Sequence, residues 1–219
     1  ESRGAVDDAQ DMSDFRVWGW RTSENESSVP VFEGEKVSAR SWTYEGGTRY
    51  WVMDQTYNFY AVHPVFPLEG NETTVNVTPY ETFTINDFDC SKTGNEAVDL
   101  MTASAKVIYK TGETPQKVGL TFQHELCKVE VIVKTDQGVT ATLHEAYFYG
   151  MAVHGTLNQI SGKSWALGSV TDQTNTPYKK VTEVELKPVS QLSLFDEMLL
   201  IPQKCAGVNL VVKFTRSGD

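Results

Sequence analysis

Apolar residues in this chain recur mostly at every second position, the period that is typical of β-strands. Apolar and polar side chains alternate in the segments 73–87, 181–189 and 207–215. In 146–157 the large residues Tyr147, Tyr149, Met151 and Val153 share one face, and small residues share the other with Phe148. TYNFYAVHP (56–64) is instead almost continuously apolar, which predicts a strand that is buried on both faces and ends at the proline. No segment has a sustained apolar stripe at helical spacing, although EAVDLMTASAK (96–106) is a candidate for a short helical turn. The pattern predicts an all-β protein.

Turn-forming residues separate these segments and indicate how the chain is organised. Clusters of Gly, Asn, Asp, Ser and Pro occur at 45–47, 91–96, 110–115, 135–138, 161–163 and 171–177. Many short strands between such turns are typical of β-sandwiches, and a chain of 219 residues is long enough for two of them in tandem. We expect a flexible polar leader at 1–13, an N-terminal sandwich at 14–116 and a C-terminal sandwich at 117–219.

The segment LTFQHELCKVEVIVK (120–134) changes its alternation partway along. Leu120, Phe122 and His124 share even parity, whereas the later apolar residues are Val129, Val131 and Val133. Since side chains of a strand alternate between its faces, the register must change near Leu126 to Lys128, through a bulge or a bend. The strand is expected to pass from one packing environment to another there.

His124 and Cys127 in this segment raise the question of a metal or catalytic site. Three residues span about 10 Å of an extended strand and place the two side chains on opposite faces, so they are poorly arranged to share one zinc ion. His124 is therefore expected to be a core histidine with satisfied ring nitrogens. The chain has no HExxH, GxSxG, P-loop or GxGxxG motif. We predict no catalytic, metal or cofactor site, and no enzyme.

The net charge limits the classes of partner, and the apolar runs and cysteines limit the class of protein. The net charge of −10, without any basic patch, argues against nucleic acid or an anionic membrane surface. No run of about 18 apolar residues is present, and no apolar leader starts at Glu1, so the chain is either cytosolic or a processed form. Three widely spaced cysteines exclude a disulfide-dense scaffold; one bridge stays open, but buried free thiols are favoured.

Four of the five tryptophans lie in the first quarter of the chain. Trp18, Trp20, Trp42 and Trp51 are candidates for a platform on which a sugar ring stacks. In half-buried strands such residues more often form core contacts and cross-strand pairs, which is the favoured interpretation.

The order of several motifs resembles the fimbrillin family of Bacteroidales, the type V pilins and their relatives. The matching segments are FRVWGW (15–20), VFEGEKVS (31–38), RYWVMDQTYNFYAVHP (49–64), DLMTASAKV (99–107), VGLTFQHELCKVEVIVK (118–134), AYFYGMAVHGTL (146–157) and LLIPQ (199–203). Each is short, but their order and spacing cover nearly the whole chain. The resemblance implies two tandem transthyretin-like, Greek-key β-sandwich domains, with the strand of His124 near their junction.

The resemblance also implies a non-enzymatic lipoprotein of the cell surface or outer membrane, a shaft, tip or anchor component of a fimbrium. In such pilins a trypsin-like protease cuts after an arginine, for which Arg3 is the matching position, and a strand of the next subunit then fills the exposed groove. The partners implied are other pilin subunits or surface ligands.

The sequence departs from the family pattern at both ends. The chain stops at Asp219 where relatives continue, so the second sandwich is expected to be incomplete, shortened or completed by another chain. The lipid-bearing cysteine is not in this sequence. The alternative function is a monomeric surface lipoprotein module that binds glycans or proteins.

Overall fold

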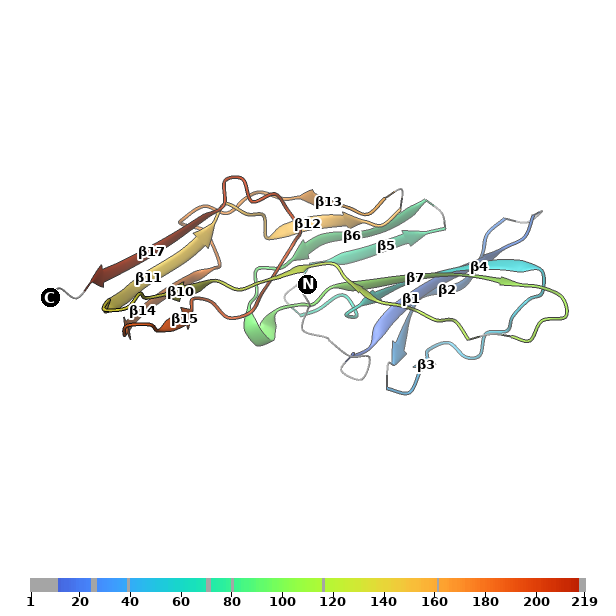
Figure 1. Ribbon diagram of the computed structural model, residues 1–219. Coiled ribbons are helices and arrows are strands. Elements are labelled where there is room, and N and C mark those ends of the chain that lie inside the picture. Colours follow the sequence, from blue (N-terminus) through green and yellow to red (C-terminus); the bar gives the residue numbers. More distant parts are fainter. Residues whose placement is uncertain are drawn as a thin grey trace.

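The computed structural model describes residues 12–24, 27–38, 40–69, 72–79, 81–115, 117–160 and 162–216. They form an elongated molecule of antiparallel β-sheets with strand β17 (Asn209–Arg216) at one end (Figure 1). The all-β prediction is confirmed; apart from the strands, the described residues contain one 3-10 turn, η1 (Gly94–Glu96). The helical turn predicted over 96–106 is wrong, because a strand starts at Met101. No helix of the described residues is long and apolar enough to cross a membrane.

The larger sheet, called the main sheet below, has six strands. Their order is β3 (Thr43–Tyr44), β2 (Val29–Ser38), β1 (Phe15–Thr22), β4 (Gln55–His63), β7 (Met101–Tyr109) and β8 (Gln123–His124). Strand β4 lies at its centre and is in contact on both faces: its odd-numbered residues are buried and its even-numbered ones at least half-buried. This confirms the doubly buried strand predicted at 56–64, which ends at His63, before Pro64.

A second sheet, the facing sheet, packs on the main sheet (Figure 1). Its order is β13 (Ser164–Leu167), β12 (His154–Asn158), β6 (Thr82–Asp89) and β5 (Thr74–Thr78). Strand β12 pairs with β6, so a hairpin from the second half of the chain extends a sheet that the first half begins. The pairing crosses the boundary expected at 116/117, and that boundary stays a prediction.

Strands β10 (Ile132–Lys134), β11 (Ala141–Tyr149), β14 (Lys179–Leu186), β15 (Gln191–Ser193) and β17 lie together at the other end of the molecule from the main sheet (Figure 1). A three-stranded sheet has the order β14, β11 and β17. Two short ladders join β9 (Cys127–Val129) to β16 (Met198–Leu200) and β10 to β15.

Both faces of the main sheet are covered, but by different means. Tyr60 of β4 meets Phe83 of β6 edge to face, with ring centroids 5.2 Å apart, in the core between the two sheets. On the opposite face, Tyr57 and Phe59 contact irregular segments before β4 and after β7. Irregular chain therefore completes the core where no third sheet is available.

Candidate functional site

One edge of strand β7 is mostly open. Strand β4 pairs with β7 along its whole length, from Gln55↔Tyr109 to His63↔Met101. On the other edge, β8 pairs only with Met101 and Thr102, and no strand among the described residues pairs with 103–109. Such an edge presents unpaired backbone N–H and C=O groups, which are a template for a further strand.

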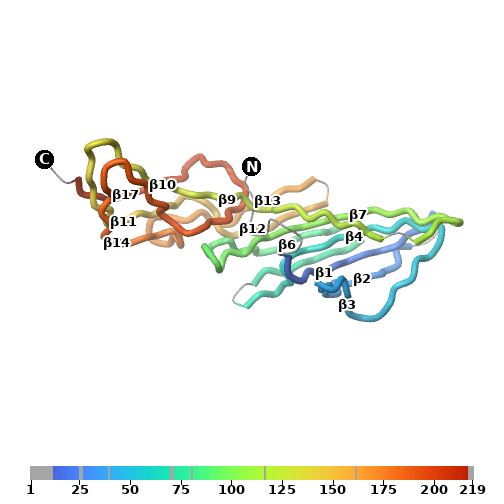
Figure 2. Tube along the Cα trace, turned by 60° about the horizontal axis from the view of Figure 1, so that its bottom comes forward, coloured from blue at the N-terminus to red at the C-terminus, as the bar shows by residue number. Residues whose placement is uncertain are grey.

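The segment that follows β7 turns back and runs beside it without forming a ladder (Figure 2). Val118, Leu120 and Phe122 of this segment pack against the outer face of the main sheet. Pairing with β7 begins only at Gln123. The even parity predicted for these apolar residues is confirmed, and it explains how the segment covers the sheet and still leaves the edge of β7 open.

A cavity of about 210 Å³ lies beside the start of this open edge. Thr102, Ala103 and Ser104 of β7 line one side, and Thr121 and Gln123 line the other. Tyr60, Phe83 and Gln159 complete its wall. The cavity is thus bounded by β7, by the returning segment and by the facing sheet.

Glu125 is the centre of a buried polar cluster next to this cavity. The residue is 3% exposed, and its Oε1 accepts hydrogen bonds from the Thr102 hydroxyl, from Gln159 Nε2 at 3.1 Å and from Lys163 Nζ at 2.8 Å. Gln159 Nε2 also donates to Thr102 Oγ1 at 2.9 Å. An ionised carboxylate in such surroundings needs this number of donors, because burying an unpaired charge is costly.

The register change predicted in 120–134 is confirmed at Glu125 and Leu126. Both residues are buried, whereas the inward-facing residues are even-numbered before them and odd-numbered after them. Strand β8 ends at His124 and pairs with β7, and β9 starts at Cys127 and pairs with β16. Sequence reasoning did not identify Glu125, whose odd number puts it on the face opposite Leu120 and Phe122; its position at the parity break is the signal that could have found it.

His124 lies beside a buried carboxylate. Its Nδ1 is 3.0 Å from Oδ1 of Asp99, whose side chain is 4% exposed. His63 is nearby and buried, and its Nδ1 lies 3.2 Å from the Asp14 carbonyl oxygen. Burial lowers the pKa of His63 below the usual value, while the Asp14 carbonyl and the charge of Asp99 oppose this shift.

Within the described ranges, no group of three or more His, Cys, Asp and Glu side chains is placed to hold a metal ion. The three cysteines are free thiols: Cys90 is buried, Cys127 half-buried and Cys205 exposed. The expectation of free thiols agrees with this, although only Cys90 is fully buried.

The four candidate stacking tryptophans do not share one environment. Trp20 is 6% exposed and packs against Tyr60, with ring centroids 6.1 Å apart. Trp51 packs against Tyr57 at 4.5 Å on the outer face. Trp18 is half-buried in the core between the sheets, and Trp42 is 64% exposed. The structure therefore does not assemble them into one platform; Arg3 lies outside the described residues.

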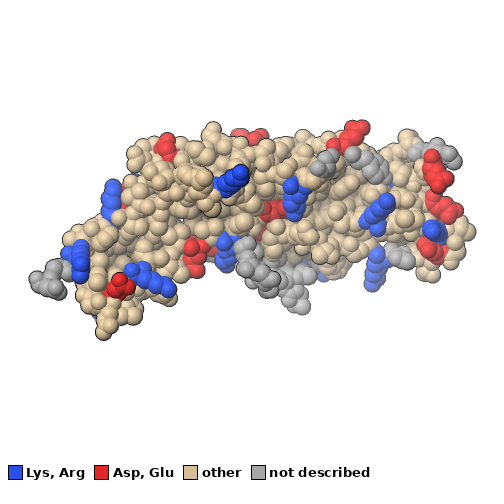
Figure 3. All heavy atoms as spheres, turned by 45° about the horizontal axis from the view of Figure 1, so that its top comes forward, with Lys and Arg blue, Asp and Glu red and all other residues tan. Residues whose placement is uncertain are grey.

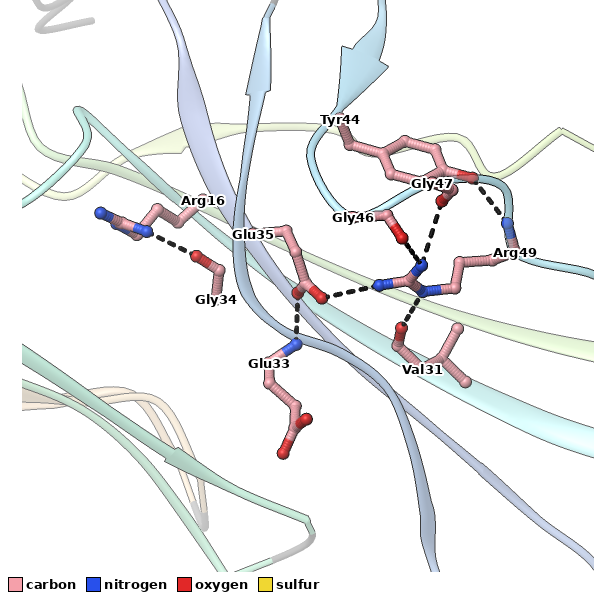
Figure 4. A network of polar contacts seen from close by, with 9 residues as sticks. All are labelled: Arg16, Val31, Glu33, Gly34, Glu35, Tyr44, Gly46, Gly47 and Arg49. Carbon is pink, nitrogen blue, oxygen red and sulfur yellow. Dashed lines mark hydrogen bonds and ion pairs between the residues drawn. The ribbon is translucent and has the colours of Figure 1, made fainter.

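Arg49 fixes the loop that precedes β4 (Figure 4). Its guanidinium donates to the carbonyl oxygens of Val31, Gly46 and Gly47, and it pairs with Glu35 at 3.0 Å. With all these donors satisfied by the protein, Arg49 is a structural residue rather than a ligand-binding one.

Charged side chains of both signs are interspersed on the face shown in Figure 3. The view shows no extended basic surface, in agreement with the acidic composition.

The antiparallel sheets and the open edge of β7 define the class of this protein as an all-β protein with an unpaired strand edge. The description of the family model that matches residues 3–219 is "Fimbrillin-like", and the chain belongs to this family. A comparison with curated protein sequences found no match. The family is structural, its members are surface-exposed fimbrial proteins, and membership implies contact with other pilin subunits.

Proposed function

We propose that this protein is a fimbrial subunit, or a tip or accessory component, that assembles by strand addition at the open edge of β7. The observation that carries the proposal is the difference in pairing along β7: nine residues pair with β4 and only two with β8. The seven unpaired residues correspond to about 23 Å of strand. That length is sufficient for a strand of ordinary size from another chain.

The direction of the free backbone groups follows from a hydrogen bond at the start of β7. Glu125 N–H donates to the Leu100 carbonyl at 2.9 Å, so the backbone of Leu100 faces β8. Backbone groups alternate between the two edges of an antiparallel strand. Ser104, Lys106 and Ile108 therefore point their N–H and C=O groups toward the open edge.

A proline at position 106 tests the proposal without removing a bond to β4. Lys106→Pro deletes an outward N–H, and proline is tolerated where that group faces an open edge. Lys106→Ser is the matched control, since it removes the same side chain and keeps the N–H. Fibres sheared from cells that make the full-length protein would be run unboiled in SDS.

We expect resistant oligomers for the unsubstituted protein and for Lys106→Ser, and their loss for Lys106→Pro with unchanged surface amounts. Normal assembly of Lys106→Pro would show that β7 is not the acceptor. If the unsubstituted, processed protein stays monomeric on cells, polymerisation itself is wrong for this chain.

The proposal includes further features that the family resemblance suggests. Export as a lipoprotein and cleavage after Arg3 would give surface fibres whose N-terminal residue is Gly4, which N-terminal sequencing measures. We also propose two transthyretin-like sandwiches, 14–116 and 117–219, which meet near His124. The grouping of β10, β11, β14, β15 and β17 away from the main sheet supports a second sandwich (Figure 1), while the β12–β13 hairpin of the second half extends the facing sheet of the first.

A second candidate function is a surface module that binds glycans. Trp42 and Tyr50 favour it, because they are 64% and 82% exposed, although isolated exposed aromatic residues are ordinary on protein surfaces. A glycan array probed with the protein and with Trp42→Ala would test it. Binding that Trp42→Ala abolishes supports this candidate, and an array without hits rejects it.

A further inference from the structure

We propose that Thr102 and Gln159 react with each other to form an internal ester bond that joins the two sheets. Thr102 lies on β7 of the main sheet, and Gln159 follows β12 of the facing sheet, 57 positions later in the chain. The inference rests on the buried polar cluster around Glu125 and is independent of the proposed function.

The two reacting groups are already in contact. Gln159 Nε2 is 2.9 Å from Thr102 Oγ1. One C–N bond of about 1.33 Å separates Nε2 from the side-chain carbonyl carbon, so that carbon lies within about 4.2 Å of the hydroxyl oxygen. A change in the torsions about the Cα–Cβ and Cβ–Cγ bonds of Gln159 moves this carbon and can bring it to the separation of about 3–3.5 Å from which attack occurs.

Glu125 is placed to act as the base and then as the acid. The Thr102 hydroxyl donates its hydrogen bond to Glu125 Oε1, and the same oxygen accepts from Gln159 Nε2 at 3.1 Å. Lys163 Nζ lies 2.7 Å from Oε2 and compensates the negative charge. One carboxylate therefore contacts both the proton that must leave the nucleophile and the nitrogen that must receive one.

The atoms balance without any other reactant. Thr102 Oγ1 forms a bond to the amide carbon of Gln159, and its proton passes to Glu125. The C–N bond of the amide then breaks, and the proton moves from Glu125 to the departing nitrogen, which leaves as ammonia. The products are an ester between the two side chains, one ammonia molecule and regenerated Glu125.

Burial makes the site suitable for an ester that lasts. Thr102 and Glu125 are 5% and 3% exposed and Gln159 is half-buried, so the surrounding side chains limit the access of water to the bond that would form. The cavity of about 210 Å³ is lined by both Thr102 and Gln159 and offers the ammonia a way out. A covalent tie between two facing sheets also restricts the unfolded chain, as a disulfide does.

High-resolution mass spectrometry of the purified, unsubstituted protein tests the inference directly. The expected mass is that of the sequence less one ammonia. Trypsin should give the peptides 93–106 and 135–163 linked to each other, since Lys92, Lys106, Lys134 and Lys163 bound them. Mild alkali should separate the two and leave a glutamate in place of Gln159.

Two variants identify the chemistry. Thr102→Val removes the nucleophile at nearly constant volume, and Glu125→Gln removes the base; both are expected to have the full sequence mass and separate peptides. The mass of the unsubstituted protein decides the question even if these variants fold poorly. Full mass with separate peptides overturns the proposal, as does loss of ammonia without linked peptides. Loss of water with a Glu125–Lys163 link would assign the cluster a different product and overturn the ester.

Discussion

The replacement of Gly150 by alanine tests how closely the backbone just after β11 packs against the turn that precedes β17. Gly150 follows β11 with φ of +92°, and a Cβ there would lie 2.2 Å from the Gly207 carbonyl oxygen and 3.1 Å from the Val208 Cα. Both neighbours are backbone atoms, so no side-chain rotation relieves the contact. Gly138 is the matched control: its φ is +77°, but no atom lies within 4 Å of its Cβ position.

The two substitutions are expected to lower the free energy of unfolding by different amounts. A positive φ costs an L-residue about 1–2 kcal/mol, and loss of glycine freedom in the unfolded chain returns about 0.4–1 kcal/mol. Gly138→Ala should therefore lower the free energy of unfolding by roughly 1 kcal/mol. Gly150→Ala carries an added steric cost of about 1–3 kcal/mol, for a total of about 2–4 kcal/mol.

Thermal unfolding followed by circular dichroism measures the difference. In a chain of this size, 1 kcal/mol corresponds to a shift in Tm of about 2–4 °C. We expect the Tm of Gly150→Ala to fall at least twice as far as that of Gly138→Ala, with the same order in urea. Equal shifts for the two variants would refute the close approach of Gly207 to Gly150.

Three other predictions concern buried groups. Tyr178→Phe removes the hydroxyl that donates to the Cys90 carbonyl at 2.8 Å, and the urea midpoint should report a loss of about 1–3 kcal/mol; Tyr50→Phe, at an exposed ring, should change it little, and equal effects would contradict the assignment. Burial lowers the pKa of His63 in the folded protein, so the unfolded chain binds more protons. The contribution of His63 to the free energy of unfolding is therefore fully present above pH of about 6.5 and is lost as the pH drops through the folded pKa. His63→Gln should flatten this dependence in urea titrations between pH 5 and 8, whereas an unchanged slope would exclude His63 as its source. Burial raises the pKa of the Cys90 thiol to about 11, so a thiol reagent at pH 8 should label exposed Cys205 within minutes and Cys90 only after denaturation; prompt labelling of Cys90 in the folded protein would count against its burial.

The strands with the clearest alternation were predictable from sequence because each has one buried face. In β6, Phe83 and Ile85 are buried while their polar neighbours are more exposed, as the period of two requires. The parity change in 120–134 predicted, within one or two residues, where the chain stops pairing with β7 and starts pairing with β16. The same argument failed for 96–106, where small residues match a helix as well as an edge strand and the pairing of β7 with β4 decides the outcome.

The candidate sites were less predictable, since they depend on which strands meet. Thr102, Glu125, Gln159 and Lys163 come from three parts of the chain, and no local spacing relates them. The tryptophans showed the same limit: the sequence grouped Trp18 and Trp42 as candidates for one platform, but one lies between two sheets and the other is largely exposed.

The sequence by itself determined the all-β class, the positions of most strands, the register change near Leu126 and, through the order of its motifs, the fimbrillin family. These properties are local, because alternation and turn chemistry act over a few residues. Only the tertiary structure decided that the hairpin β12–β13 joins β6, that one edge of β7 stays open and that Glu125 is buried among donors. Each of these depends on long-range pairing, and a residue's own neighbours in the chain do not encode which distant strand will pack against it.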